Sequence, residues 1–100
     1  MDSLNPPLTN RVVIEYCPRC GWLLRAAWLA QELLTTFATE LTELALKPAA
    51  SGTFRIWANQ TLVWDRAVND GFPQAAELKR LVQPLIAPGK DLGHSGKSAG

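Results

Sequence analysis

The two cysteines of the chain are separated by two residues, in the segment YCPRCGW at positions 16–22. A short β-branched run precedes this segment and the longest helical pattern follows it, so we expect Cys17 and Cys20 in the first turn of a helix. A helix N-terminus presents unpaired backbone N–H groups and a partial positive charge, which favour a thiolate over a thiol. Two thiols on one turn can also form an intramolecular disulfide. The pattern therefore predicts reversible thiol–disulfide chemistry at these two residues.

The residues around the cysteines suit supporting roles. Pro18 fits the first helical turn, where its missing N–H costs nothing, and Arg19 adds a positive charge beside the thiols. On a helical wheel Cys20 lies toward the buried side, which favours Cys17 as the attacking thiol and Cys20 as the resolving one. Trp22, one turn from the thiols, either shields the edge of the helix or forms part of a docking surface for a partner.

Two alternatives compete with redox chemistry at this pair. Zinc takes four ligands, of which Cys17 and Cys20 supply two, and the single histidine, His94, lies in a Gly- and Ser-rich C-terminal stretch. A zinc site would therefore need two cysteines from each of two chains, and we predict no metal. The cysteines could also be an inert buried pair, although their place at a strand-to-helix turn argues against it. No catalytic triad or phosphate-binding glycine loop is visible in the sequence.

Four short motifs occur in one order along the chain: YCPRCGW at 16–22, GTFRI at 52–56, NDGFP at 69–73 and DLGH at 91–94. Through these motifs the chain resembles bacterial Cys-x-x-Cys members of the selenoprotein W-like family. The resemblance implies a thioredoxin-like fold and a thiol redox role, with Gly21 and Gly52 as supporting residues of the site. Animal members carry selenocysteine at the position that matches Cys20, which makes Cys20 the alternative attacking group.

The resemblance also bears on partners. It implies protein thiols or low-molecular-weight thiols, with glutathione as a candidate co-substrate and no bound cofactor. Thioredoxins carry a cis-proline that would fall near Gly52 in this chain. Because glycine has no side chain, Gly52 would instead let a partner backbone approach closely. Glutathione or a specific protein thiol is therefore as consistent with the sequence as a broad set of disulfides.

Length and composition limit the other functions. The chain has 100 residues, of which 47% are hydrophobic, and this suffices for one small domain with a single core. We expect a flexible leader at 1–10, a domain at 11–87 and a flexible tail at 88–100. A net charge of +1 gives no basic surface for nucleic acid, and no apolar run is long enough to cross a membrane. Since no secretory signal is visible, we expect a cytoplasmic protein with a role in redox homeostasis.

Hydrophobic periodicity predicts the order strand, helix, strand, strand, strand, helix. The expected segments are a fully buried strand at 11–16, a helix at 18–41, a strand at 43–47, a hairpin at 53–65 with its turn at 59–60, and a last helix from 73. A right-handed crossover makes the first two strands parallel. The expected fold is α/β and thioredoxin-like, with a four-stranded mixed sheet in the order 2-1-3-4 and both helices on one face.

Apolar stripes indicate the buried side of each helix. In the first helix the stripe consists of Leu23, Ala27, Ala30, Leu34, Phe37 and Leu41. In the last helix it consists of Leu78, Leu81, Val82 and Leu85. Pro84 lies inside this second pattern, where we expect a kink or an early end of the helix.

The opposite face of the expected sheet has no helix to cover it. With a two-residue turn in the hairpin, strict alternation places Trp57, Leu62 and Trp64 on this open face. Exposed apolar patches often mark interfaces, so we expect the open face to form a homodimer or to bind a partner. Two function classes follow: a thiol oxidoreductase that cycles Cys17 and Cys20, and a redox-sensing interaction module whose partner binding depends on the disulfide.

Overall fold

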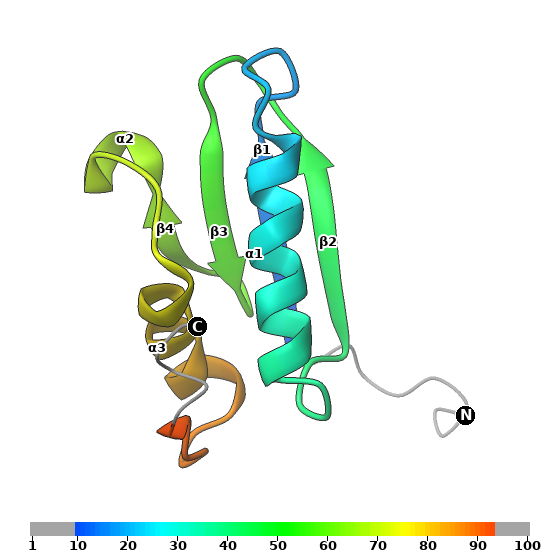
Figure 1. Ribbon diagram of the computed structural model, residues 1–100, viewed down its shortest axis with the longest axis vertical. Coiled ribbons are helices and arrows are strands. Elements are labelled where there is room, and N and C mark those ends of the chain that lie inside the picture. The colour runs from blue at the N-terminus through cyan, green and yellow to red at the C-terminus, as the bar shows by residue number, and fades with distance from the viewer. Residues whose placement is uncertain (1–9, 94–100) are drawn as a thin grey trace.

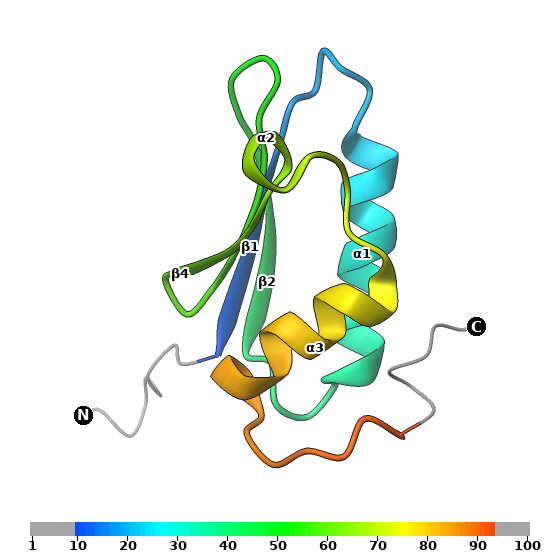
Figure 2. The same ribbon diagram turned by 90° about the vertical axis from the view of Figure 1, so that its left-hand side faces the viewer.

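The structure, a computed structural model, describes residues 10–93. Its elements are, in chain order, β1 (Arg11–Tyr16), α1 (Leu23–Thr36), β2 (Glu43–Pro48), β3 (Phe54–Ala58), β4 (Thr61–Asp65), α2 (Arg66–Asn69) and α3 (Ala75–Ile86). The strands form one sheet in the order β2-β1-β3-β4, in which β1 is parallel to β2 and the other pairs are antiparallel. Helices α1 and α3 cover one face of the sheet (Figure 1, Figure 2). The predicted sheet order and helix placement are confirmed, and the short helix α2 is an addition to them.

The core lies between the sheet and the two long helices. Side chains of β1 alternate: Val12, Ile14 and Tyr16 are buried, and the residues between them face the other side. The prediction that this strand is buried on both faces is therefore wrong, because no helix within residues 10–93 covers the second face. Apolar residues from β3, α1 and α3 complete the core: Phe54, Ile56, Ala58, Ala26, Leu29, Ala30, Leu33, Leu78, Val82 and Ile86.

Helix α1 is shorter than predicted and is rotated about its axis. Its buried residues are Ala26, Leu29, Ala30 and Leu33. Leu23 and Leu34, which belong to the predicted stripe, are 46% and 45% exposed. Both stripes have helical spacing, so periodicity alone could not choose between them. Two of the four buried residues are alanines, whereas Leu23 and Leu34 lie at the edges of the buried side.

A β-bulge in the hairpin changes which tryptophan faces the open side. Trp57 pairs with Leu62, but the residue before Trp57 pairs with Trp64, so β4 has one residue more than β3 across this step. The extra residue, Val63, shifts Trp64 onto the core face, where it is 7% exposed and donates a hydrogen bond from Nε1 to the carbonyl oxygen of Gly71 at 2.9 Å. The prediction that Trp64 lies on the open face is therefore wrong.

The hairpin turn has the predicted length of two residues, Asn59 and Gln60, with φ angles of 48° and 72°. A type I′ hairpin turn requires positive φ at both positions, and glycine meets this requirement without strain. Asn59 tolerates this region, and its Oδ1 accepts a hydrogen bond from the backbone N–H of Arg11 at 2.7 Å. Gln60 brings a Cβ into the same region, so the second position of the turn is strained.

We expect Gln60→Gly to raise the free energy of unfolding by about 0.5–1 kcal/mol, because relief of the left-handed strain outweighs the extra freedom that glycine gives the unfolded chain. Urea denaturation at an unchanged m-value measures this gain. Gln60→Ala is the matched control, since it removes the same amide group but keeps Cβ, and it should give no gain. An equal gain in both variants would mean that the amide, and not the backbone, is the unfavourable element.

Helix α3 continues past Pro84 to Ile86, so the expected early end is wrong, and the kink stays a prediction. The proline lies in the last turn, where the loss of one intrahelical hydrogen bond matters least. Leu78 and Val82 are buried as predicted, whereas Leu81 is 39% exposed. None of the helices within residues 10–93 is long and apolar enough to cross a membrane.

The chain that follows α3 contacts the domain as far as it is described. Nζ of Lys90 lies 3.1 Å from Oε2 of Glu40, and this hydrogen bond holds the pKa of the Glu40 carboxyl below its usual value. Leu92 packs against the core. The predicted domain boundary at residue 87 stays a prediction. Most of the predicted leader and the end of the predicted tail, at residues 1–9 and 94–100, lie outside the described residues.

Candidate active site

The cysteine loop, residues 17–21, connects β1 to the segment that starts α1. Cys17 and Cys20 are joined by a disulfide, and their Cα atoms lie 5.3 Å apart. The N–H of Gly21 donates to the carbonyl oxygen of Pro18 at 3.1 Å, and that of Trp22 donates to the carbonyl oxygen of Cys17 at 3.4 Å. These two bonds have the pattern of a Schellman motif, which closes a helical turn with one left-handed residue. The cysteine loop therefore forms a separate helical turn that is closed by its own two hydrogen bonds.

Gly21 occupies the left-handed position of this turn, with a φ angle of 76°. A Cβ at Gly21 would meet no atom within 4 Å, so the backbone conformation, and not crowding, favours glycine there. Helix α1 begins only at Leu23, with Trp22 as its N-cap residue. The prediction that the cysteines lie in the first helical turn is therefore wrong, because the Schellman turn separates them from the helix.

The two cysteines differ in exposure. Cys17 is completely buried, whereas Cys20 is exposed. The backbone N–H of Cys20 donates a hydrogen bond to Sγ of Cys17 at 3.1 Å. The expectation that Cys20 lies toward the buried side is wrong, because it assumed that both residues continue the helix. Access therefore favours reaction at Cys20, and the hydrogen bond favours negative charge on the sulfur of Cys17.

The other residues predicted to support the cysteines lie close by. Pro18 and Arg19 are exposed on the cysteine loop itself. The loop between β2 and β3 lies beside it at the same end of the sheet (Figure 1), and the N–H of Ala49 donates to the carbonyl oxygen of Tyr16 at 2.8 Å. Gly52, on this second loop, is exposed and has a φ angle of 80°, with open space where a Cβ would lie. The structure thus places exposed backbone, with no side chain at Gly52, beside the cysteine loop.

Trp22 packs into a cluster of three aromatic rings that meet edge to face. Its ring centroid lies 5.1 Å from that of Phe72 and 6.2 Å from that of Phe54, and the two phenylalanine centroids lie 4.9 Å apart. The guanidinium carbon of Arg66 lies 4.8 Å from the Trp22 centroid, and that of Arg25 lies 4.1 Å from the Phe72 centroid. This aromatic cluster therefore connects the cysteine loop to the core and to two cations.

Sequence reasoning missed Phe72 and Arg25 as neighbours of the cysteine loop. One local signal existed for Arg25, since a residue three positions after Trp22 lies on the same side of a helix. Phe72 comes from a turn far along the chain, and no local pattern indicates that it packs on Trp22.

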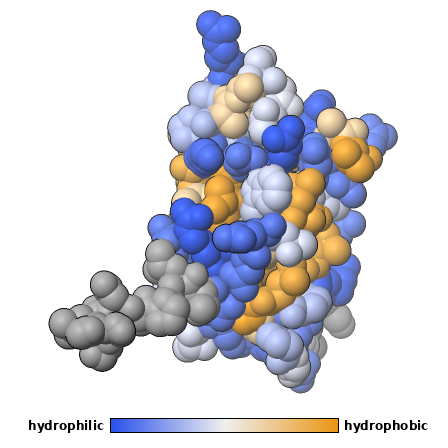
Figure 3. Space-filling view, turned by 180° about the vertical axis from the view of Figure 1, so that it is seen from behind, coloured by the Kyte–Doolittle hydropathy of each residue, from blue (hydrophilic) through white to orange (hydrophobic). Residues whose placement is uncertain are grey.

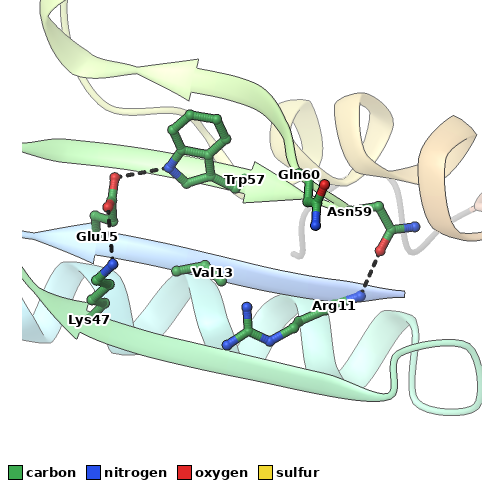
Figure 4. Close-up of a pocket in the computed structure, with 7 residues that line it drawn as sticks. All are labelled: Arg11, Val13, Glu15, Lys47, Trp57, Asn59 and Gln60. Carbon is green, nitrogen blue, oxygen red and sulfur yellow. Dashed lines mark hydrogen bonds and ion pairs between the residues drawn. The ribbon is translucent and has the colours of Figure 1, made fainter. Parts of the chain in front are cut away.

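Trp57 and Leu62 lie on the open face of the sheet, so the structure does not bring them together with Trp22. A hollow of about 540 Å³ on this face is lined by Arg11, Val13, Glu15, Lys47, Trp57, Asn59 and Gln60 (Figure 4). The indole N–H of Trp57 donates to the Glu15 carboxylate at 2.9 Å. Figure 3 shows apolar surface interleaved with hydrophilic surface on this side of the molecule.

A row of alternating charges crosses all four strands of the open face. Lys47 of β2 and Arg55 of β3 each lie 3.9 Å from a carboxylate oxygen of Glu15 on β1. Arg55 also lies 3.3 Å from Asp65 of β4. The two positive and two negative charges balance along this row. The open face is therefore more polar than the sequence predicted, although the row has no excess of either charge.

Within residues 10–93, no group of three or more histidine, cysteine, aspartate or glutamate side chains is arranged to hold a metal ion. His94 lies outside the described residues.

Comparisons with known proteins agree on one family. Residues 11–84 match the Rdx family. A solved structure of a selenoprotein W-related protein from Vibrio cholerae is similar with a TM-score of 0.76 and 45% identity, over 78% of this chain and 98% of that chain. A protein from Bordetella parapertussis gives a TM-score of 0.73 and 53% identity, over 75% of this chain and 95% of that chain. A search of curated proteins gave no match.

Proposed function

The chain belongs to the Rdx family, as its resemblance to selenoprotein W-like proteins indicated, and on this premise we propose that it is a thiol–disulfide redox protein that cycles Cys17 and Cys20. The observation that carries the proposal is the disulfide between a buried and an exposed cysteine. Exchange needs one accessible sulfur for the partner and a second sulfur to resolve the mixed disulfide. The cysteine loop supplies one of each.

In the reducing direction, the Cys20 thiolate attacks one sulfur of a substrate disulfide and expels the other as a thiolate. Cys17 then attacks Sγ of Cys20, which forms the intramolecular disulfide and expels the second substrate thiolate. Both expelled thiolates take up the protons that the two cysteines lost, so the protein gives up two electrons and the substrate gains them.

A partner thiolate reverses these steps when it attacks the exposed Cys20. Cys17 is then the leaving group, and the N–H of Cys20, 3.1 Å from its sulfur, stabilises the negative charge that develops there. A better stabilised leaving thiolate departs faster. The buried cysteine therefore contributes to the rate of opening as well as to the resolving step.

The partners in this proposal are protein thiols or small thiols such as glutathione. The exposed backbone at Gly52 supports it, because an extended partner segment can approach there without a steric clash. We place the cycle in the cytoplasm, where a reducing thiol pool would regenerate the dithiol form and serve redox homeostasis.

Reduction of bis(2-hydroxyethyl) disulfide by the reduced protein tests this function. We expect each protein molecule to release two equivalents of 2-mercaptoethanol and to acquire a Cys17–Cys20 disulfide, which mass spectrometry of the alkylated protein detects. With glutathione as the reductant in excess, the reaction should turn over. Protein alkylated at both cysteines is the control. Consumption of the substrate without formation of the intramolecular disulfide would contradict the proposal.

A second candidate function, the redox-sensing interaction module, is favoured by two side chains of α1. Leu24 is 80% exposed and Trp28 is 56% exposed, and they lie one helical turn apart shortly after the cysteine loop. Apolar side chains exposed in this way often contact another protein. Such a module would bind its partner with an affinity that depends on the disulfide, but it would show little turnover in the assay above.

A further inference from the structure

Arg25 and Arg66 hold two positive charges against the rings of Phe72 and of Trp22, the residue that follows the cysteine loop. Their guanidinium carbons lie 4.1 Å and 5.6 Å from the centroid of the same ring, Phe72, and that of Arg66 also lies 4.8 Å from the Trp22 centroid. Trp22 directly follows the loop, and its N–H donates to the carbonyl oxygen of Cys17. One cation comes from α1 and the other from α2, so two separate elements bring charge to this place.

No carboxylate balances this pair of arginines in the described part of the chain. The ion pairs found within residues 10–93 all involve other cations. Nε of Arg66 is buried without a hydrogen-bond partner. Aromatic faces attract guanidinium groups, but they do not replace an oxygen acceptor, and two like charges beside one ring repel each other. Both arginines therefore keep N–H donors for an anion that the described residues do not supply.

We propose that Arg25 and Arg66 bind a carboxylate of the reacting partner while its sulfur is at Cys20. This inference rests on the proposed function, because it assigns a substrate feature to the same site. A planar guanidinium forms paired hydrogen bonds with a carboxylate, and the aromatic rings already restrict its motion, so little side-chain freedom is lost on binding. The carboxylate can belong to a small disulfide or to an acidic residue beside a protein cysteine.

Three small disulfides of nearly equal length test the charge preference. They are 3,3′-dithiodipropionate, which is anionic, bis(2-hydroxyethyl) disulfide, which is neutral, and cystamine, which is cationic. The rate constant for each with the reduced protein is divided by the rate constant with dithiothreitol, which corrects for intrinsic reactivity. We expect a normalised rate about fivefold higher for the anionic disulfide than for the neutral one, and a lower rate for cystamine. High salt should reduce both differences.

Substitutions assign the preference to the two arginines. Arg66→Gln should lower the ratio of the normalised anionic rate to the normalised neutral rate, and the double variant Arg25→Gln/Arg66→Gln should bring this ratio to about one. Arg66→Lys keeps the charge and should keep part of the preference. Arg11→Gln is the matched control, because it removes one positive charge at the end of β1 far from the cysteine loop. Circular dichroism and the urea midpoint of each variant show that it is folded.

A second arm identifies the source of the carboxylate. Two disulfide-linked peptides are compared that differ only in glutamate or glutamine beside the cysteine. A preference for the glutamate peptide that depends on Arg66 assigns the site to protein partners, and a preference confined to dithiodipropionate assigns it to small thiols. Equal rates in both arms, or an effect of Arg11→Gln as large as that of Arg66→Gln, would refute the carboxylate site. If even the neutral disulfide is not reduced, the proposed redox function fails and this inference fails with it.

Discussion

Cys17→Ser and Cys20→Ser are both expected to lose turnover with bis(2-hydroxyethyl) disulfide, and to differ in the first step. Cys17→Ser keeps the exposed Cys20, so it should form a mixed disulfide quickly and hold it, because no second thiol resolves it. Cys20→Ser keeps the buried Cys17, which a partner reaches poorly. We expect it to form the mixed disulfide at least about tenfold more slowly.

Intact mass spectrometry after an acid quench follows both adducts over time, and the unfolded variants serve as the control for intrinsic reactivity. In urea the two variants should react at similar rates, since burial no longer separates the two thiols. Faster modification of Cys20→Ser under native conditions would assign the attack to Cys17 instead. The two cysteines would then exchange roles, with Cys20 as the resolving residue.

Trp64→Ala should lower the free energy of unfolding by about 3–5 kcal/mol, which is typical of a large aromatic side chain lost from a core. The indole is 7% exposed, and its N–H bonds to the Gly71 carbonyl oxygen at 2.9 Å, so the substitution also removes that bond. Trp57→Ala is the matched control from the same hairpin. Because Trp57 lies on the open face and is only partly buried, it should cost about 1–2 kcal/mol.

Urea denaturation of the two variants measures this difference, and an unchanged m-value shows that both unfold the same cooperative unit. The comparison tests the bulge at Val63 directly. In a hairpin with strict alternation Trp57 and Trp64 would share a face, and the two substitutions would have similar effects. Similar losses would therefore contradict the register of β4.

Much of the sheet was predictable because its signals are local. The β-branched run at 11–16, the two-residue turn at 59–60 and the right-handed crossover indicate the first strand, the hairpin and the parallel pairing of β1 with β2. The order 2-1-3-4 followed from the thioredoxin-like fold that the family resemblance implies. The bulge was not predictable, because one inserted residue leaves the alternation on either side of it intact. The rotation of α1 was missed for a similar reason: two stripes have the same spacing, and contacts with the sheet decide between them.

The cysteines of the candidate site were predicted correctly, but their geometry was not. The spacing of Cys17 and Cys20 indicated a disulfide, and the structure has one. The sequence pattern predicts a helix that begins at Pro18, whereas Gly21 closes a separate turn. This error reversed the expected burial of the two cysteines. It shows that a glycine directly after a Cys-x-x-Cys pair can close a separate turn, so that the helix begins only after this turn.

Apart from Arg25, the cationic and aromatic residues around the site could not be predicted from local patterns. Phe72 and Arg66 are distant from the cysteines in the chain and reach Trp22 only through the fold. Arg66 begins α2, whose N-cap residue Asp65 accepts a hydrogen bond from Ala67 at 3.0 Å. A short local cap therefore helps to place a side chain that contacts the active site.

The reduction potential of the Cys17–Cys20 pair tests the central claim most directly. The protein is equilibrated across glutathione buffers, quenched by alkylation and analysed by mass spectrometry, with zinc content measured in the same sample. We predict a metal-free intramolecular disulfide with a potential of about −180 to −270 mV, the range of known exchange proteins. Thiols that do not pair at any buffer composition, or that carry zinc, would contradict a redox function for this loop.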